Sequence, residues 1–198
     1  MTDLDTALRD LAPLGVLIGW RRIAEGDEGA LNRGEISATN LSVRRASGAV
    51  RIVARELLRA PDLAIPKGEG GEPIWPRMVV GSLAHDDEIA IAATANAEDY
   101  EAIGIDIERA EPLVAETFAL VVTDRERAMI GDDAMKATLL FAVKEAVYKA
   151  AYPLDRVFLE FADIEVDLDQ GVAATKPGRS LTVRYATTLS HVVALAYA

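Results

Sequence analysis

The sequence contains no cysteine and only two histidines, His85 and His191. Without cysteine the chain can form no disulfide, and it cannot offer a thiolate as a nucleophile or a metal ligand. Two histidines are too few for a multi-histidine metal centre. The absence of cysteine fits a reducing compartment. The N-terminus is acidic, with Asp3 and Asp5 where a secretory signal would be basic. We therefore expect a cytoplasmic location.

Long apolar runs and net positive charge are also missing. No apolar run approaches the roughly 20 residues that a membrane-spanning helix needs. The net charge of −11 opposes binding to phosphate backbones and to anionic lipid. We therefore expect no nucleic-acid partner and no stable membrane association. Against this acidic background one basic cluster stands out, at Arg44, Arg45, Arg51, Arg55 and Arg59.

The size and composition are those of a globular protein with a substantial core. Of the 198 residues, 51% are hydrophobic and 27% are charged. This length suits one domain, or two halves of about 100 residues each. The segment Ser-Leu-Ala-His at 82–85 resembles Thr-Leu-Ser-His at 188–191, and each precedes an apolar run. This echo predicts two similarly built halves, residues 1–100 and 101–198.

Hydrophobic periodicity predicts helices and strands in both halves. Helices are expected over residues 1–12, 47–59 and 136–151, with Pro153 lying beyond the end of the last one. Another helix is expected to begin at Thr123, which has Glu126 three residues on as in a capping box. Residues 113–122 fit either helix or strand. Strands are expected at 14–20, 78–83, 88–94, 104–108, 158–166, 179–186 and 191–197.

Acidic side chains in two of these elements suggest a cation site. In the strand at 104–108, Asp106 and Glu108 alternate with isoleucines, so the two carboxylates share one face about 7 Å apart. If the helix at 136–151 crosses this strand, Glu145 adds a third carboxylate, with Lys149 one turn further along. Oxygen donors of this kind suit Mg²⁺. Each feature also has an ordinary interpretation, as the solvent face of a strand and as a surface ion pair.

Two motifs in this order resemble the signatures of the 4′-phosphopantetheinyl transferases. They are Gly-Ile-Asp-Ile-Glu at 104–108 and Phe-Ala-Val-Lys-Glu-Ala-Val-Tyr-Lys-Ala at 141–150. The segments 67–76 and 81–85 and the Arg-rich stretch 44–55 resemble the bacterial branch that includes enterobactin synthase component D. The resemblance implies that Mg²⁺ is bound by Asp106, Glu108 and Glu145, with Glu145 also the catalytic base. It implies that the phosphates of coenzyme A are held by Arg51, Lys67, His85 and Lys149, and by Arg44 at a spacing one residue away from the family's.

The sequence departs from the family pattern in the first half. Ala84 stands where Ser or Thr is usual before the histidine, and Val50 replaces a frequent glycine before Arg51. The Glu-Phe usually found in the Arg-rich segment is replaced by residues 46–49. The three carboxylates and Lys149 are unaffected.

The expected protein is an α+β molecule of two similar halves, packed as a pseudo-twofold with the active-site cleft between them. The resemblance implies that it moves the 4′-phosphopantetheine arm of coenzyme A onto a serine of an apo acyl or peptidyl carrier protein, with Mg²⁺ as cofactor. A single chain that holds both sides of the cleft is expected to act as a monomer. Three alternatives stay open: a protein that binds coenzyme A and carrier without turnover, an unrelated Mg²⁺-dependent phosphoryl-transfer enzyme, and an acidic interaction domain.

Overall fold

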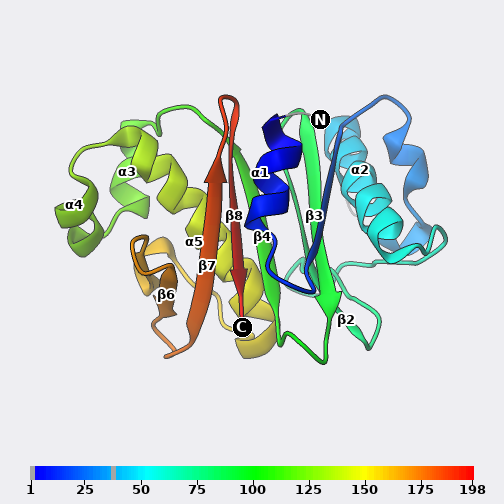
Figure 1. Cartoon of the computed structure of the whole chain (residues 1–198). Coiled ribbons are helices and arrows are strands. Elements are labelled where there is room, and N and C mark those ends of the chain that lie inside the picture. Colours follow the sequence, from blue (N-terminus) through cyan, green and yellow to red (C-terminus); the bar gives the residue numbers. More distant parts are fainter. Residues whose placement is uncertain (1–2, 37–38) are drawn as a thin grey trace.

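The computed structural model describes residues 3–36 and 39–198 and consists of helices and two antiparallel sheets (Figure 1). The α+β class expected from the sequence is confirmed. The helices are α1 (Asp3–Leu11), α2 (Leu41–Leu58), α3 (Ala115–Val121), α4 (Asp124–Ile130) and α5 (Ala134–Asp155), with 3₁₀ turns at Asp27–Ala30, Arg33–Glu35 and Phe161–Asp163. The strands are β1 (Leu17–Arg22), β2 (Val79–His85), β3 (Ile89–Asn96), β4 (Ile103–Arg109), β5 (Ile164–Asp167), β6 (Val172–Thr175), β7 (Ser180–Thr187) and β8 (His191–Tyr197).

The two sheets repeat one order of elements. The first sheet has the order β1-β3-β2 and the second has the order β4-β8-β7-β6-β5. In each, a first strand (β1 or β4) leads to a long helix (α2 or α5), and the second strand of a later hairpin (β2–β3 or β7–β8) pairs with that first strand. The similar segments 82–85 and 188–191 lie at the turns of these two hairpins. The division at residues 100 and 101 stays a prediction.

Strand β4 separates the two hydrophobic cores. Its odd-numbered residues Ile103, Ile105 and Ile107 pack with β3, β8 and α1, the helix that lies across the junction of the sheets in Figure 1. Its even-numbered residues face the opposite way, because successive side chains of a strand alternate between its faces. Asp106 and Glu108 therefore lie on the side of β4 that α5 covers.

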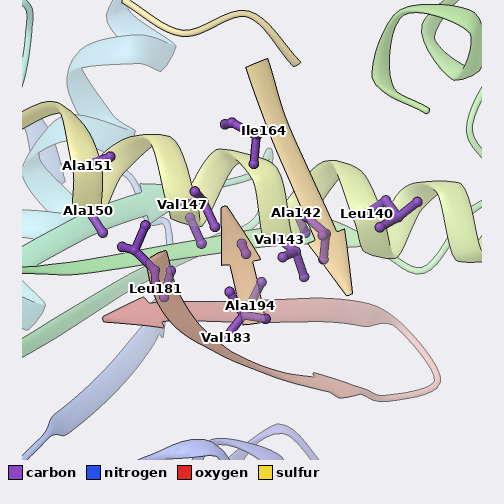
Figure 2. Close-up of a cluster of buried hydrophobic side chains, with 14 of the residues drawn as sticks. Leu140, Ala142, Val143, Val147, Ala150, Ala151, Ile164, Leu181, Val183 and Ala194 are labelled. Carbon is purple, nitrogen blue, oxygen red and sulfur yellow. The ribbon is translucent and has the colours of Figure 1, made fainter. Parts of the chain in front are cut away.

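The second core forms between α5 and the five-stranded sheet. Figure 2 shows Val143 and Val147 of α5 pointing toward Val183 and Ala194 of the strands. Gly104 permits this close packing, because a Cβ atom at that position would lie 1.8 Å from the carbonyl oxygen of Ala146. The glycine at the head of the acidic strand therefore lets β4 and α5 approach to backbone contact.

The first half is organised by α2, which is longer than the sequence pattern predicted. It begins at Leu41 instead of residue 47, because the side chain of Asn40 accepts a hydrogen bond from the backbone N–H of Ser42 and caps an extra turn. The extra turn carries polar residues that the apolar stripe did not include. The predicted β2–β3 hairpin is confirmed. Residues 113–122 resolve as helix α3.

Other expectations in the second half were wrong in detail. Pro153 is exposed and lies inside α5 without ending it, while Ala150, Ala151 and Leu154 on either side of it hold this last part of the helix against the second core. The helix ends two residues after the proline, where Arg156 adopts a left-handed conformation. Only Ile164–Asp167 of the expected strand 158–166 is extended. Strand β6 was not predicted, since its four residues are too few for a clear alternation.

Candidate active site

The carboxylates of β4 meet the basic end of α5. Asp106 is 5% exposed, and its Oδ1 atom accepts a hydrogen bond from the Lys149 ammonium at 2.6 Å. The same ammonium lies 3.3 Å from the carbonyl oxygen of Ile105. Both ordinary interpretations of these residues were wrong. Asp106 is not on a solvent face, and the ion pair of Lys149 joins α5 to β4 instead of following the surface of the helix.

Burial and crowding make these carboxylates hard to ionise. Burial, followed by the negative charge of Asp106, raises the pKa of Glu108 to about 7. Burial and then Asp106 also raise the pKa of Glu145. Burial raises the pKa of Asp106 itself, even though Lys149 acts in the opposite direction. The site therefore holds more carboxyl groups than one ammonium can balance in their ionised form.

The oxygen atoms at this site are of the kind that binds divalent cations. The Oδ2 atom of Asp106 is buried and has no hydrogen-bond partner among the described residues, so it is an unpaired oxygen donor. Glu108 and Glu145 lie within electrostatic reach of it. Among residues 3–36 and 39–198, however, no three such side chains converge closely enough to hold a metal ion as they stand. The three carboxylates are neighbours, and Lys149 is their counter-ion.

Three basic residues of the first half line a small cavity. Arg51, Lys67 and His85 all line a space of about 170 Å³. Arg51 is 2% exposed and donates to the carbonyl of Ile65 at 2.9 Å and to the hydroxyl of Ser47 at 2.6 Å. Lys67 and His85 are exposed. Burial raises the pKa of Asp106, and the charge of His85 is among the effects that oppose this rise, so His85 lies near Asp106. The basic cavity therefore adjoins the carboxylates.

The remaining arginines of the cluster have different roles. Arg55 is buried and donates to both carboxylate oxygens of Glu35, at 2.8 and 2.9 Å, which ties the 3₁₀ turn to α2. Arg44 lines neither the basic cavity nor the neighbouring cavity that includes His85. Arg45 instead lines a cavity of about 470 Å³ that also includes His85, and it pairs with Glu28 at 3.2 Å. Helical rotation by one residue separates these two arginines by about 100°.

A larger cavity of about 490 Å³ continues from the basic one. The two share Gly71, Pro73 and Leu83 as lining residues. Beyond them the larger cavity is lined by β2, by the start of β4 and by α5, so it lies between the two halves. Its wall includes the charged residues Glu145 and Lys149, further charged residues at Glu72, Glu101 and Arg156, and apolar and aromatic side chains at Ile74, Trp75, Tyr148, Tyr152, Pro153 and Leu154. The two cavities adjoin at these shared residues, and we refer to them together as the groove, with basic residues of the first half on one cavity and Glu145 and Lys149 of the second half on the other.

Two family models match the chain, one on each half. The model of the 4′-phosphopantetheinyl transferase superfamily matches residues 102–195, and that of the 4′-phosphopantetheinyl transferase N-terminal domain matches residues 32–95. The chain belongs to the 4′-phosphopantetheinyl transferase superfamily. The matched residues hold both sides of the groove, so the family resemblance and the geometry concern the same site.

Individual members of the superfamily are also similar to the chain. The 4′-phosphopantetheinyl transferase Npt of Nocardia iowensis is 42% identical over 61% of this chain and 57% of its own. The transferase Svp of Streptomyces mobaraensis is 38% identical over 62% of this chain and 54% of its own. Enterobactin synthase component D of Salmonella austin is 30% identical over 50% of this chain and 44% of its own. The chain spans about half the length of the curated relatives it matches.

Several residues that shape this transferase-like groove were not singled out from the sequence. Ser47 and Glu35 fix the guanidinium groups of α2, and Trp75 and Tyr152 line the larger cavity. Lys144, next to Glu145, is fully buried and pairs with Glu126 at 2.7 Å. A lysine directly before the predicted base was a signal that could have drawn attention.

None of the helices in the described parts of the chain is long and apolar enough to reach across a bilayer.

Proposed function

We propose that this protein transfers the 4′-phosphopantetheine arm of coenzyme A to a serine of an apo carrier protein, with Mg²⁺ as cofactor. The observation that carries the proposal is the single groove on which Arg51, Lys67 and His85 of one half meet Glu145 and Lys149 of the other. Coenzyme A carries a pyrophosphate and a ribose phosphate, and cations at one end of a groove suit such a ligand.

The two cavities suit different parts of coenzyme A. The basic cavity is small and is lined by cations that can hold phosphate oxygens. The larger cavity has aromatic walls at Trp75, Tyr148 and Tyr152, and the uncharged pantetheine arm fits such a lining. This placement leaves the pyrophosphate at the junction, beside Lys149. The bond that must break would then lie next to the carboxylates.

Asp106, Glu108 and Glu145 would hold the metal, and Oδ2 of Asp106 is the donor already free to do so. When bound, Mg²⁺ supplies positive charge that stabilises the pyrophosphate oxygens during transfer. The serine oxygen of the carrier attacks the phosphorus that bears the pantetheine arm. The bond from that phosphorus to the bridging oxygen breaks, and 3′,5′-adenosine bisphosphate leaves with the bonding electrons.

Glu145 would take the proton of the serine hydroxyl. Burial raises its pKa, so the ionised carboxylate is a stronger base than an exposed one. Lys149 is 27% exposed at its side chain and lies on the next turn of α5, where it can neutralise the phosphoryl group. Both residues belong to α5, which presents them to the groove.

The carrier protein would approach beside Tyr148. Phe158 is 72% exposed, and its ring lies 5.8 Å from that of Tyr148, which lines the larger cavity. Val157, which is 42% exposed, extends this apolar surface. Carrier domains of fatty-acid, polyketide, siderophore or peptide synthases are often acidic, as the family implies, and this chain has a net charge of −11. An apolar docking surface would limit the repulsion.

The test is to incubate the protein with Mg²⁺, coenzyme A and an apo carrier, and to weigh the carrier by mass spectrometry. The proposal expects a gain of one phosphopantetheine on the carrier serine. It also expects that Glu145→Gln abolishes the gain while leaving thermal unfolding nearly unchanged. The matched control is Glu56→Gln, an exposed carboxylate on α2. Coenzyme A binding without transfer by the wild-type protein would indicate a protein without turnover and would refute the proposal.

The cation roles have a separate test in binding. Lys67→Ala is expected to weaken coenzyme A binding by about tenfold, as for the loss of one charge-assisted hydrogen bond. Dephospho-coenzyme A and pantetheine can be compared with coenzyme A by calorimetry to find which phosphate each residue recognises. The protein is expected to be a monomer, because one chain supplies both walls of the groove. Equal affinity for coenzyme A and pantetheine would contradict a phosphate-binding role for the basic cavity.

A further inference from the structure

The two halves are joined by a buried hydrogen bond next to the groove. The bond connects His191, the first residue of β8, to Asp86, which follows the last residue of β2. Nε2 of His191 lies 2.8 Å from Oδ2 of Asp86, and the two side chains are only 7% and 8% exposed. Neither residue lies among the predicted ligands of coenzyme A or Mg²⁺. This contact therefore takes no direct part in the proposed reaction.

The geometry defines the direction of each hydrogen bond. An ionised carboxylate only accepts hydrogen bonds, so the proton of this bond is on Nε2 of His191. In the neutral ring Nδ1 is then the acceptor, and it lies 2.9 Å from the hydroxyl oxygen of Ser190. The other oxygen of Asp86, Oδ1, accepts from the backbone N–H groups of Glu88 and Ile89 at 2.7 Å each. Asp86 thus links the β2–β3 turn to β8 through both of its oxygens.

His85 is the residue whose position depends on this link. It ends β2 immediately before Asp86, and its Nδ1 atom lies 3.2 Å from the backbone carbonyl oxygen of Asp86. Its ring lines both the small basic cavity and the neighbouring one that includes Arg45. His85 is exposed and, among the described residues, its ring has no other hydrogen bond. Pairing with Ala90 of β3 fixes its backbone, and the turn that follows provides the one hydrogen bond that the ring makes among the described residues.

An ion pair spans the same junction but is more exposed to water than the bond between His191 and Asp86. Arg109 of β4 lies 3.1 Å from Glu88, and these side chains are 38% and 49% exposed. Exposed pairs of this kind contribute little, because water screens them. The buried bond between His191 and Asp86 is the contact in which loss of one partner leaves the other unsatisfied. It is accordingly the stronger determinant of where the turn lies.

We propose that His191 is a positioning residue for coenzyme A binding, which acts by holding Asp86 and thereby orienting His85 toward the groove. The proposal rests on the proposed function, since it assigns the purpose of the contact to coenzyme A. It places one residue of the acidic half in control of a phosphate-binding residue of the basic half. The two halves would then contribute jointly to substrate affinity as well as to catalysis.

The binding test compares two replacements of His191. His191→Leu removes the donor, whereas the amide nitrogen of His191→Gln can occupy the place of Nε2 and donate to Asp86. We expect His191→Leu to raise the Kd and KM for coenzyme A about tenfold, with kcat at saturating coenzyme A changed by less than about twofold. His191→Gln should restore most of the affinity. Equal affinity of the Leu variant and the wild type would overturn the proposal, as would equal weakening in both variants.

A double variant separates positioning from general loss of stability. If His191 acts through His85, then His85→Ala and the double variant His85→Ala with His191→Leu should bind coenzyme A equally weakly. Losses that add would show an independent effect and would overturn the proposal. The matched control is Arg179→Leu, which removes a bidentate pair with Asp155 between α5 and β7. It should lower stability without changing coenzyme A affinity.

Nuclear magnetic resonance tests the positioning without coenzyme A. The chain has only two histidines, so replacement of His191 leaves the imidazole signals of His85 alone in a ¹H–¹⁵N spectrum. These signals should shift and broaden in His191→Leu and keep their positions in His191→Gln and Arg179→Leu. Unchanged His85 signals in the Leu variant would overturn the positioning role. If the wild type does not bind coenzyme A, the proposed function fails, and this spectrum still decides whether His191 orients His85.

Discussion

Stability should fall as pH rises through neutrality, and Glu108 is the residue that makes this testable. Its pKa is raised from 4.5 to about 7 by burial and by the charge of Asp106. The folded state therefore binds a proton that the unfolded chain has already lost. The resulting stabilisation is complete below pH 4.5 and is lost as pH rises through about 7. The variant Glu108→Gln, which imitates the protonated side chain, should escape this loss.

The magnitude follows from the two pKa values. They differ by about 2.5, and each unit corresponds to about 1.36 kcal/mol. Ionisation of Glu108 should therefore cost about 3 kcal/mol of the free energy of unfolding once pH is well above 7. The pKa values of Glu145 and Asp106 are raised as well, so their ionisation acts in the same direction. Carboxyls whose pKa values are lowered, such as Glu35 and Asp155, lose their contribution only below about pH 4.5.

The assay is urea unfolding of the wild type and Glu108→Gln between pH 5 and pH 8 in a metal-chelating buffer. The difference between the two proteins cancels all other titrating groups to first order. It should favour the variant at both ends of the range and should grow by about 2–3 kcal/mol between pH 5 and pH 8. A difference that is constant across this range, or that grows toward low pH, would refute the reasoning. Repeating the titration with Mg²⁺ tests the metal proposal, which expects a smaller loss in the wild type.

Two further predictions concern packing around α5. Gly104→Ala should destabilise the protein by about 2–3 kcal/mol in urea unfolding, because the added methyl would lie 1.8 Å from the carbonyl oxygen of Ala146. The control Gly29→Ala has open space and should cost far less, so equal costs would contradict the packing argument. Lys144→Met should cost about 3–5 kcal/mol, because it leaves the Glu126 carboxylate buried without its cation. Adding Glu126→Gln should recover part of that loss, and a double variant no more stable than Lys144→Met would count against a charge effect.

The parts of the site that lie within one element were predictable. The alternation of isoleucine and acidic residues in β4 placed Asp106 and Glu108 on one face, and the helical spacing of Glu145 and Lys149 placed them one turn apart. Both depend on backbone periods of two and 3.6 residues, which are the same in any protein. The resemblance of these motifs to the 4′-phosphopantetheinyl transferases then indicated the superfamily, which the family models confirm.

The parts that depend on how elements meet were not predictable. The Arg-rich segment did not reveal that Arg45, and not Arg44, lines the cavity beside His85. Nor did it reveal that Arg55 would be bound by Glu35. A difference of one residue turns a side chain by about 100° around a helix, so which one faces a groove depends on the packing of the whole helix. The end of α5 was misplaced for a similar reason, since contacts in the core extend the helix past Pro153.

The sequence by itself determined most of the strands and helices and the two sets of charged side chains, because hydrophobic period and local charge are properties of neighbouring residues. Only the tertiary structure decided that the two sets lie on one groove, that Lys149 pairs with Asp106, and that His191 meets Asp86 across the junction. The last two contacts join residues 43 and 105 positions apart. No local period extends over such separations, so these contacts are set by the angle at which the two sheets and α5 pack together.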